Sequence, residues 1–135
     1  MIELTETLLA GEHETVWRDL AALREHGVRV AIDDFGTGYS SLGYLRRRPI
    51  DVVKIDRMFI DDMVESPHQL ALVTGIVSLA QSLDLTVIAE GIETPLHRDL
   101  LVDLGCVLGQ GYHFSCPVDA TEALSQMTEV QPLVA

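Results

Sequence analysis

Basic residues and long apolar runs are both scarce in this chain of 135 residues. Nine Lys and Arg stand against 21 Asp and Glu, and the formal charge of −12 argues against a nucleic-acid polymer as the partner. No apolar run approaches the roughly 20 residues of a membrane span. The first residues, MIELTETLLA, also lack the basic start and the apolar stretch of a signal peptide. We therefore expect a cytoplasmic chain with one cored domain over residues 1–130 and a frayed tail over 131–135.

Cysteine is also rare, with Cys106 and Cys116 as the two thiols of the chain. This pattern predicts reduced, partly buried thiols rather than a disulfide. Together with His113 they offer three possible metal ligands, but their spacing fits no closed zinc pattern. The excess of acidic residues has two possible explanations. The negative charge either keeps the protein soluble, or it binds divalent cations, which reverse the local field of a carboxylate cluster and so attract an anionic ligand.

Short runs rich in β-branched residues alternate with helical segments along the whole chain, which is typical of βα units on a parallel sheet. We expect five strands, over 2–6, 28–33, 51–56, 85–90 and about 106–115. The helix after the first strand, about 12–26, has Val16, Leu20 and Leu23 at the spacing of a buried face. Ser66-Pro67 and Thr94-Pro95 each resemble a cap residue followed by proline at the first helical position.

Ionisable residues follow apolar runs in each of the first four expected strands: Glu3, Asp33, Lys54 with Asp56, and Glu90. The carboxyl ends of parallel strands meet at one surface, where the catalytic groups of such folds gather. Each acid taken singly is better explained as a helix cap or turn former, since its side chain bonds nearby backbone N–H groups. The recurrence at four strands is what indicates a shared site.

The adjacent pair Asp33-Asp34 is the strongest single feature. Two neighbouring carboxylates repel unless a cation or hydrogen bonds hold them, and such acids can bridge a metal pair. Lys54 and Asp56 point to the same face of their strand by the period of two. They form either a structural ion pair or a charged group that orients water and stabilises charge on a phosphoryl group.

Several motifs occur in a fixed order along the chain. They are Glu3-Leu4-Thr5-Glu6, Asp33-Asp34-Phe35-Gly36-Thr37-Gly38-Tyr39-Ser40-Ser41-Leu42, Asp51-Val52-Val53-Lys54-Ile55-Asp56-Arg57, Val87-Ile88-Ala89-Glu90-Gly91-Ile92-Glu93-Thr94, Gly105-Cys106 and Gly109-Gln110-Gly111-Tyr112. This series closely resembles the EAL family of cyclic-di-GMP phosphodiesterases over residues 1 to about 118. Any one motif is weak, whereas the ordered set is specific.

The resemblance implies an α/β fold that is the C-terminal part, about five βα units, of a TIM-like (βα)₈ barrel. It also implies hydrolysis of cyclic di-GMP to the linear dinucleotide with Mg²⁺ or Mn²⁺ at a two-metal site. The positions of the motifs assign the roles. The implied metal ligands are Glu3, Asp33, Asp34 and Glu90, and the implied groups around the attacking water are Lys54, Asp56 and Glu90. Contacts to the substrate or support for the site come from Gln110, Glu6 and Glu93. The loop that the family links to metal binding and dimer contacts includes Phe35, Gly36, Thr37 and Gly38.

The chain also departs from the family pattern. The Glu-Ala-Leu motif on an early strand, its arginine and the metal-binding asparagine of the following strand would all lie before Met1, and Cys116 stands where a basic residue is common. We therefore expect a partial EAL domain of low or no activity by itself, open to self-association or to pairing with the missing N-terminal barrel segment. The alternatives are a non-catalytic cyclic-di-GMP-binding or protein-interaction module, and an unrelated metal-dependent barrel such as an enolase-like one. The adjacent aspartates weigh against the unrelated barrel.

Overall fold

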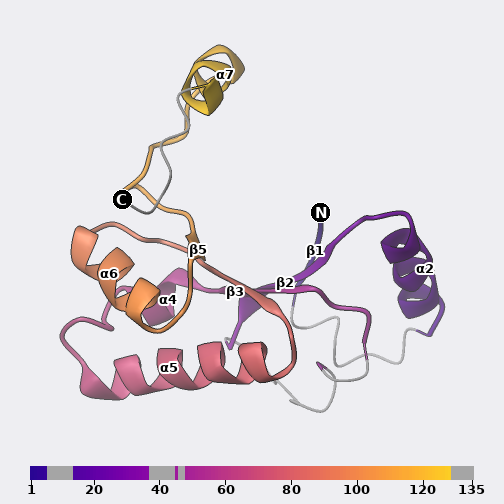
Figure 1. Ribbon diagram of the computed structural model, residues 1–135, viewed down its shortest axis with the longest axis horizontal. Helices are drawn as coiled ribbons and strands as arrows, with labels where there is room; N and C mark the ends of the chain where they lie inside the picture. Colours follow the sequence, from indigo (N-terminus) through magenta and orange to yellow (C-terminus); the bar gives the residue numbers. More distant parts are fainter. Residues whose placement is uncertain (6–13, 37–44, 46–47, 129–135) are drawn as a thin grey trace.

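A computed structural model describes residues 1–5, 14–36, 45 and 48–128 (Figure 1). Five parallel strands form one sheet in the order β1-β2-β3-β4-β5, so that neighbours in the chain are neighbours in the sheet. The elements are β1 (Ile2–Thr5), α2 (Glu14–Glu25), β2 (Val30–Phe35), β3 (Val52–Ile55), α4 (Arg57–Ile60), α5 (Pro67–Ser82), β4 (Thr86–Ala89), α6 (Pro95–Asp103), β5 (Leu108–Gly109) and α7 (Ala120–Thr128). The predicted parallel α/β architecture is confirmed.

Helices cover one face of the sheet, and α5 is the longest of those described (Figure 1). Its apolar residues Val73, Val77 and Ala80 are buried in a cluster with Ile55 of β3 and Ala89 of β4. Burial of this stripe, rather than helix propensity, is what holds a helix on a sheet. The face of β3 that carries Lys54 is the opposite one, because side chains alternate along a strand.

Both predicted cap-and-proline helix starts are confirmed. Ser66 Oγ accepts a hydrogen bond from the backbone N–H of Gln69 at 3.2 Å, and Thr94 Oγ1 accepts one from His97 N–H at 3.2 Å. Each hydroxyl satisfies one of the backbone donors that a helix leaves free at its first turn. These caps set where α5 and α6 begin, and the Thr94 cap therefore sets where the loop after β4 ends.

The buried face of α2 differs from the predicted one. Trp17 and Leu20 are buried, whereas Val16 and Leu23 are 37% and 40% exposed. Trp17 offers the larger apolar surface, and the Arg48 guanidinium lies 4.7 Å from the centroid of its ring. Turning the helix toward Trp17 therefore buries more apolar area than turning it toward Val16.

The fifth strand is much shorter than predicted, with Leu108–Gly109 in place of 106–115. After Gly109 the chain leaves the sheet and bonds to the loop after β4, where Gln110 O accepts from Ile92 N–H at 3.0 Å. A Cβ on Gly111 would lie 2.2 Å from the carbonyl oxygen of Ile92, so only glycine allows this approach. Close packing on a loop has replaced strand pairing here.

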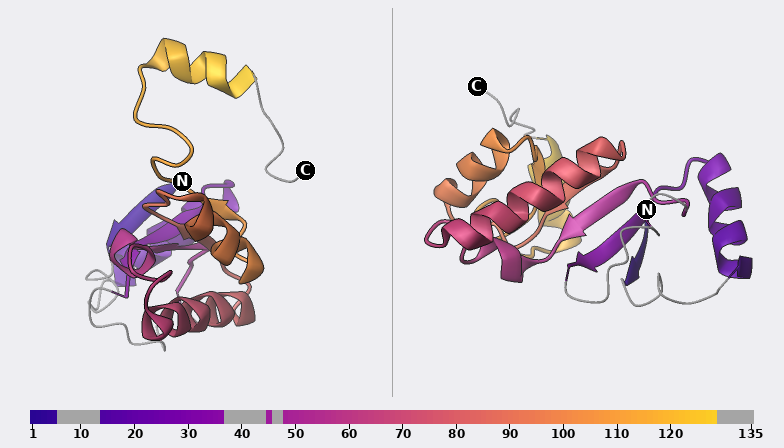
Figure 2. Two further views of the ribbon diagram at one scale, coloured as in Figure 1. Left: turned by 90° about the vertical axis from the view of Figure 1, so that its left-hand side faces the viewer. Right: turned by 90° about the horizontal axis from the view of Figure 1, so that it is seen from below.

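Helix α7 stands away from the sheet in Figure 1 and in the left view of Figure 2. Its residue Leu124 is 66% exposed. None of the described helices is long and apolar enough to cross a membrane.

An ion pair at the amino-terminal end of the sheet ties α2 to two strands. Asp51, just before β3, accepts hydrogen bonds from Arg24 at 2.6 and 3.0 Å and from Val30 N–H at 2.9 Å. Burial by itself raises the pKa of Asp51, but the bonds from Arg24 and Val30 outweigh it, so that the pKa is lowered from 3.8. The ionised carboxylate is thus the form that the folded chain favours.

Replacing Asp51 with Asn should lower the free energy of unfolding by about 1 kcal/mol at neutral pH, because the pair is partly exposed. A lowered pKa gives stability that is present above the unfolded pKa of 3.8 and is lost as pH falls through the lower folded value. Urea unfolding of Asp51→Asn and the unmodified chain at pH 7 and pH 3 tests this. The difference between the two proteins should shrink at pH 3, and an unchanged difference would contradict the role of the charge.

Candidate functional site

Lys54 is the centre of the site. Its Nζ lies 2.7 Å from Asp33 Oδ1, 2.7 Å from Glu90 Oε1 and 3.0 Å from Glu3 Oε2. These three acids come from β1, β2 and the end of β4, and the Lys54 side chain between them is only 8% exposed. Three of the strand-end acids predicted to converge therefore do so around one ammonium group, and Asp56 does not.

The ion pairs keep Lys54 charged despite its burial. Burial alone lowers the pKa of Lys54, but the ion pairs with Asp33, Glu90 and Glu3 outweigh it and raise the pKa well above its ordinary value. The predicted alternative of a Lys54–Asp56 pair is wrong for the described residues, in which Lys54 pairs with these three acids.

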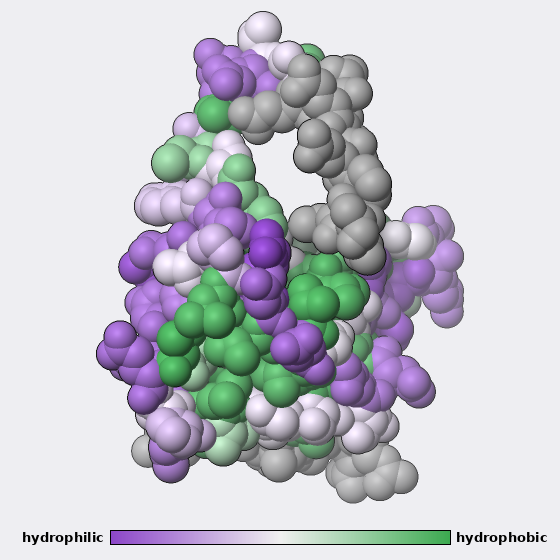
Figure 3. Space-filling model, turned by 60° about the vertical axis from the view of Figure 1, so that its left-hand side comes forward, coloured by the Kyte–Doolittle hydropathy of each residue, from purple (hydrophilic) through white to green (hydrophobic). Residues whose placement is uncertain are grey.

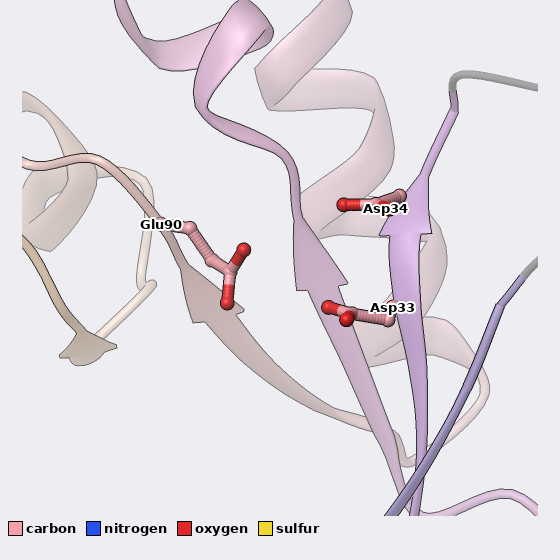
Figure 4. A group of neighbouring side chains, drawn as sticks. All are labelled: Asp33, Asp34 and Glu90. Atoms are coloured by element: carbon pink, nitrogen blue, oxygen red, sulfur yellow. The ribbon is translucent and has the colours of Figure 1, made fainter.

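Asp33, Asp34 and Glu90 form a compact oxygen cluster, which we call the carboxylate triad (Figure 4). One carboxylate oxygen from each lies within 4.8 Å of the other two. Asp33 and Asp34 extend from β2 and Glu90 from the end of β4, and all three point across the tip of β3.

A bulge in β2 explains how two consecutive residues face the same site. The pairing of β2 with β3 shifts between Ile32 and Phe35, and Asp34 has φ +53°. In a regular strand Asp33 and Asp34 would point to opposite faces. Asp tolerates this left-handed conformation better than most residues, and an extra residue at a bulge re-aims the side chain.

Asp34 and Asp56 interact at the edge of the triad. Burial, the charge of Asp33 and a hydrogen bond with Asp56 together raise the pKa of Asp34, against a smaller opposing effect of Lys54. Asp56 is the N-cap of α4 and accepts from Met58 N–H at 2.7 Å. The cap reading of Asp56 therefore holds, and the residue also lies beside the triad.

The other predicted site residues fall into two groups. Gln110 Nε2 donates to Glu90 Oε1 at 2.8 Å, which places it against the triad. Glu93 is outside it and pairs with Arg57 at 2.8 Å. Phe35 is buried, and a Cβ on Gly36 would lie 2.8 Å from the ring of Phe59, so the start of the loop packs tightly.

Three predicted residues, Glu6, Thr37 and Gly38, lie outside the described residues. Glu3 contacts Lys54 but is not part of the triad. Both cysteines are free thiols, with Cys106 buried and Cys116 exposed. In the part of the chain that the structure describes, Cys106, His113 and Cys116 form no group of possible metal ligands.

A cleft of about 450 Å³ lies beside the triad. Its lining includes Glu90, Gln110, Glu93, Arg57 and Tyr112. Sequence reasoning did not single out Arg57 or the cleft. The position of Arg57, directly after the ionisable end of β3, was the available indication.

The triad fits a divalent cation such as Mg²⁺ or Mn²⁺. Its donors are carboxylate oxygens, which these hard cations prefer, and their closeness permits shared coordination. Burial and the charge of Asp33 raise the pKa of Asp34, and a bound cation would relieve the repulsion between these two adjacent acids. Asp33, Asp34 and Glu90 are therefore the residues that would hold such an ion.

Comparison with known proteins places this geometry in context. The family model described as EAL domain matches residues 1–117. Among curated proteins, the chain is 47% identical over 117 residues to the cyclic di-GMP phosphodiesterase NbdA of Pseudomonas aeruginosa, covering 87% of this chain and 15% of that protein. It is 41% identical over 133 residues to the oxygen sensor protein DosP of Escherichia coli strain K12, covering 98% and 16%.

Solved structures of EAL proteins have the same fold as this chain. The EAL domain of Mycobacterium smegmatis DcpA superposes with a TM-score of 0.87 at 38% identity, covering 94% of this chain and 57% of that one. Klebsiella pneumoniae BlrP1, in a manganese and cyclic-di-GMP complex, gives 0.77 at 40% identity over 86% of this chain and 30% of that one. EAL domains form TIM-like barrels, of which this chain covers a part. The chain thus spans only part of the length of the relatives that it matches.

The tripeptide Glu122-Ala123-Leu124 does occur in the chain, but in α7. Glu122 and Leu124 are exposed there, on a helix that stands away from the sheet (Figure 2). This tripeptide therefore has no place in the strand-end site.

Proposed function

The chain belongs to the EAL domain family, and we propose that its strand-end site serves the hydrolysis of cyclic di-GMP to the linear dinucleotide. The observation that supports this most directly is the carboxylate triad beside a buried, charged Lys54. A cleft of about 450 Å³ next to Glu90 offers room for part of a nucleotide. The substrate and the reaction come from the relatives, and the residues at the site suit them.

We propose that Asp33, Asp34 and Glu90 hold Mg²⁺ or Mn²⁺, with Asp33 between two ions. Bound cations would lower the pKa of a coordinated water and offset charge on the phosphoryl group. Lys54 fixes Asp33 and Glu90 through ion pairs of 2.7 Å and keeps a positive charge next to them.

Glu3 is the predicted ligand of the first cation, and its position favours a second candidate function. Its carboxylate is paired with Lys54 at 3.0 Å and lies outside the triad, so a cation on that side would have few protein ligands in the described chain. Loose coordination favours a module that binds cyclic di-GMP without turning it over. Both functions require binding of cyclic di-GMP, but only the first includes its hydrolysis.

A hydrolysis assay separates them. The chain alone should turn over cyclic di-GMP more slowly than about 1 per second, the low end for enzymes. Misplacement of reacting groups by about 1 Å costs on the order of 100-fold, so adding the strands that the chain lacks relative to a longer EAL domain should raise the rate by at least that factor. An inactive mixture that still binds cyclic di-GMP would indicate the binding module. A mixture that neither binds nor hydrolyses it would contradict both.

We further propose a cytoplasmic location for the chain.

We also propose that the sheet pairs with another polypeptide segment or with a second copy of the chain. β1 and β5 are the edges of the described sheet. On the side where α4, α6 and β5 lie, Figure 3 shows apolar surface between charged groups, and exposed residues of these elements include Met58, Leu96, Val102 and Leu108. Unpaired edges and apolar surface favour association. A stable monomer at micromolar concentration in sedimentation velocity would argue against a second copy.

A further inference from the structure

The loop after β4, residues 90–93, carries Glu90 at one end and Glu93 at the other. One side of this loop is held by the backbone after β5. Ile92 N–H donates to Gln110 O at 3.0 Å, and Ile92 O accepts from His113 N–H at 2.9 Å. A Cβ on Gly111 would meet the Ile92 backbone, so the two segments lie in direct contact. Glu90 is thus fixed on the β5 side by backbone packing.

Arg57 holds the other side of the same loop. Its guanidinium Nη2 lies 2.8 Å from Glu93 Oε1, and its Nε donates to Asp61 at 3.0 and 3.2 Å. Its aliphatic stem rests on Gly91, where a Cβ would lie 2.4 Å from Arg57 Cγ. Gly91 has φ +71°, so both its backbone conformation and this contact require glycine. The loop is clamped between Arg57 and the residues after β5.

The charges around Arg57 argue for positioning rather than for anion binding. One guanidinium faces the carboxylates of Asp61 and Glu93, so its single positive charge is already offset. Its planar fork suits two partners at once, which a lysine ammonium on a flexible stem does not reproduce. Arg57 lines the cleft beside Glu90, and through Glu93 and Gly91 it bears on the backbone that carries Glu90.

We propose that Arg57 is a positioning residue that fixes the 90–93 loop, and through it sets the Glu90 carboxylate in the triad. Glu93 pairs with it on the loop, and Asp61, the C-cap of α4, pairs with it on the other side. The expected effect of Arg57 on cation binding rests on the proposed function. The effect of Arg57 on the 90–93 loop does not, and it can be measured independently. The supporting role that the resemblance assigns to Glu93 then follows from its pairing with Arg57.

The experiment compares Arg57→Gln, Arg57→Lys and the control Arg18→Gln with the unmodified chain. Arg18 pairs with Asp19 at 3.6 Å on α2, and its side chain is exposed. Hydrogen–deuterium exchange reports on the 90–93 loop, and calorimetric titration with Mn²⁺ reports on the triad. Loss of a residue that orients a metal ligand without touching the metal lowers metal affinity by about tenfold or more. Arg57→Gln should therefore weaken Mn²⁺ binding by about that factor.

We expect faster exchange at residues 90–93 in Arg57→Gln, partial recovery in Arg57→Lys and no change in Arg18→Gln. The double variant Arg57→Gln/Glu93→Gln should be no worse than Arg57→Gln, since the pair acts as one unit. Unchanged exchange at 90–93, or changed exchange with unaltered Mn²⁺ affinity, would overturn the assignment. If the loop loosens but no protein, including the unmodified chain, binds Mn²⁺, the clamp on the loop stands and the proposed function fails.

Discussion

Replacing Lys54 with Met should lower the free energy of unfolding by about 3–5 kcal/mol in buffer without divalent cations, because it leaves three partly buried carboxylates without their shared positive charge. Lys54 lies within 3.0 Å of carboxylate oxygens of Glu3, Asp33 and Glu90. Methionine fills similar space but leaves those three acids facing one another. Because typical domains have only about 5–15 kcal/mol of stability, a loss of this size approaches global unfolding.

Urea unfolding with EDTA present measures the effect, and Arg98→Gln serves as the control. The Arg98–Asp99 pair is exposed, so its loss should cost no more than about 1 kcal/mol. Adding Mn²⁺ should recover more stability in Lys54→Met than in the unmodified chain, because a ligand that binds only the folded state stabilises it. A Lys54→Met protein as stable as the unmodified chain in EDTA would show that the ammonium group does not hold the acids together.

Asp33 should be the least replaceable residue for cation binding. Asp33 belongs to the triad and also pairs with Lys54, whereas Glu93 lies outside the triad and pairs with Arg57. We expect Asp33→Asn to weaken Mn²⁺ binding by more than about 100-fold, beyond the range for an outer residue, and Glu93→Gln by about tenfold.

Calorimetric titration of both variants with Mn²⁺ and with Mg²⁺ compares them directly. Circular dichroism at each titration temperature checks that both proteins are folded. Equal affinities in the two variants would contradict a central role for Asp33 and would shift the metal site away from the triad.

The alternation of strands and helices could be predicted from the sequence because each element follows local rules. The caps at Ser66 and Thr94 need only a hydroxyl before a proline, and the first four strands need only an apolar run. The face of α2 and the length of the fifth strand depended on distant partners. Trp17 meets Arg48, and the residues after Gly109 bond to the loop after β4.

The candidate site shows the same division. That Asp33, Lys54 and Glu90 converge follows from parallel strands whose carboxyl ends share one surface. That Lys54 would join three acids rather than Asp56 depended on the pairing of strands far apart in sequence, since Glu3 and Lys54 lie 51 residues apart. The contact between Arg57 and Gly91 depended likewise on how the loops after β3 and β4 come together.

The bulge in β2 makes the site sensitive to chain length as well as to composition. Asp33 and Asp34 face Glu90 together because one extra residue is accommodated between Ile32 and Phe35, with Asp34 at φ +53°. Deleting a residue here would restore regular alternation and turn one carboxylate to the helix-covered face, while all other acids kept their identity. Asn at position 34 accepts the same backbone conformation without the charge. Substitutions at position 34 can therefore change the electrostatic potential of the metal site without changing its backbone shape, two properties that usually change together.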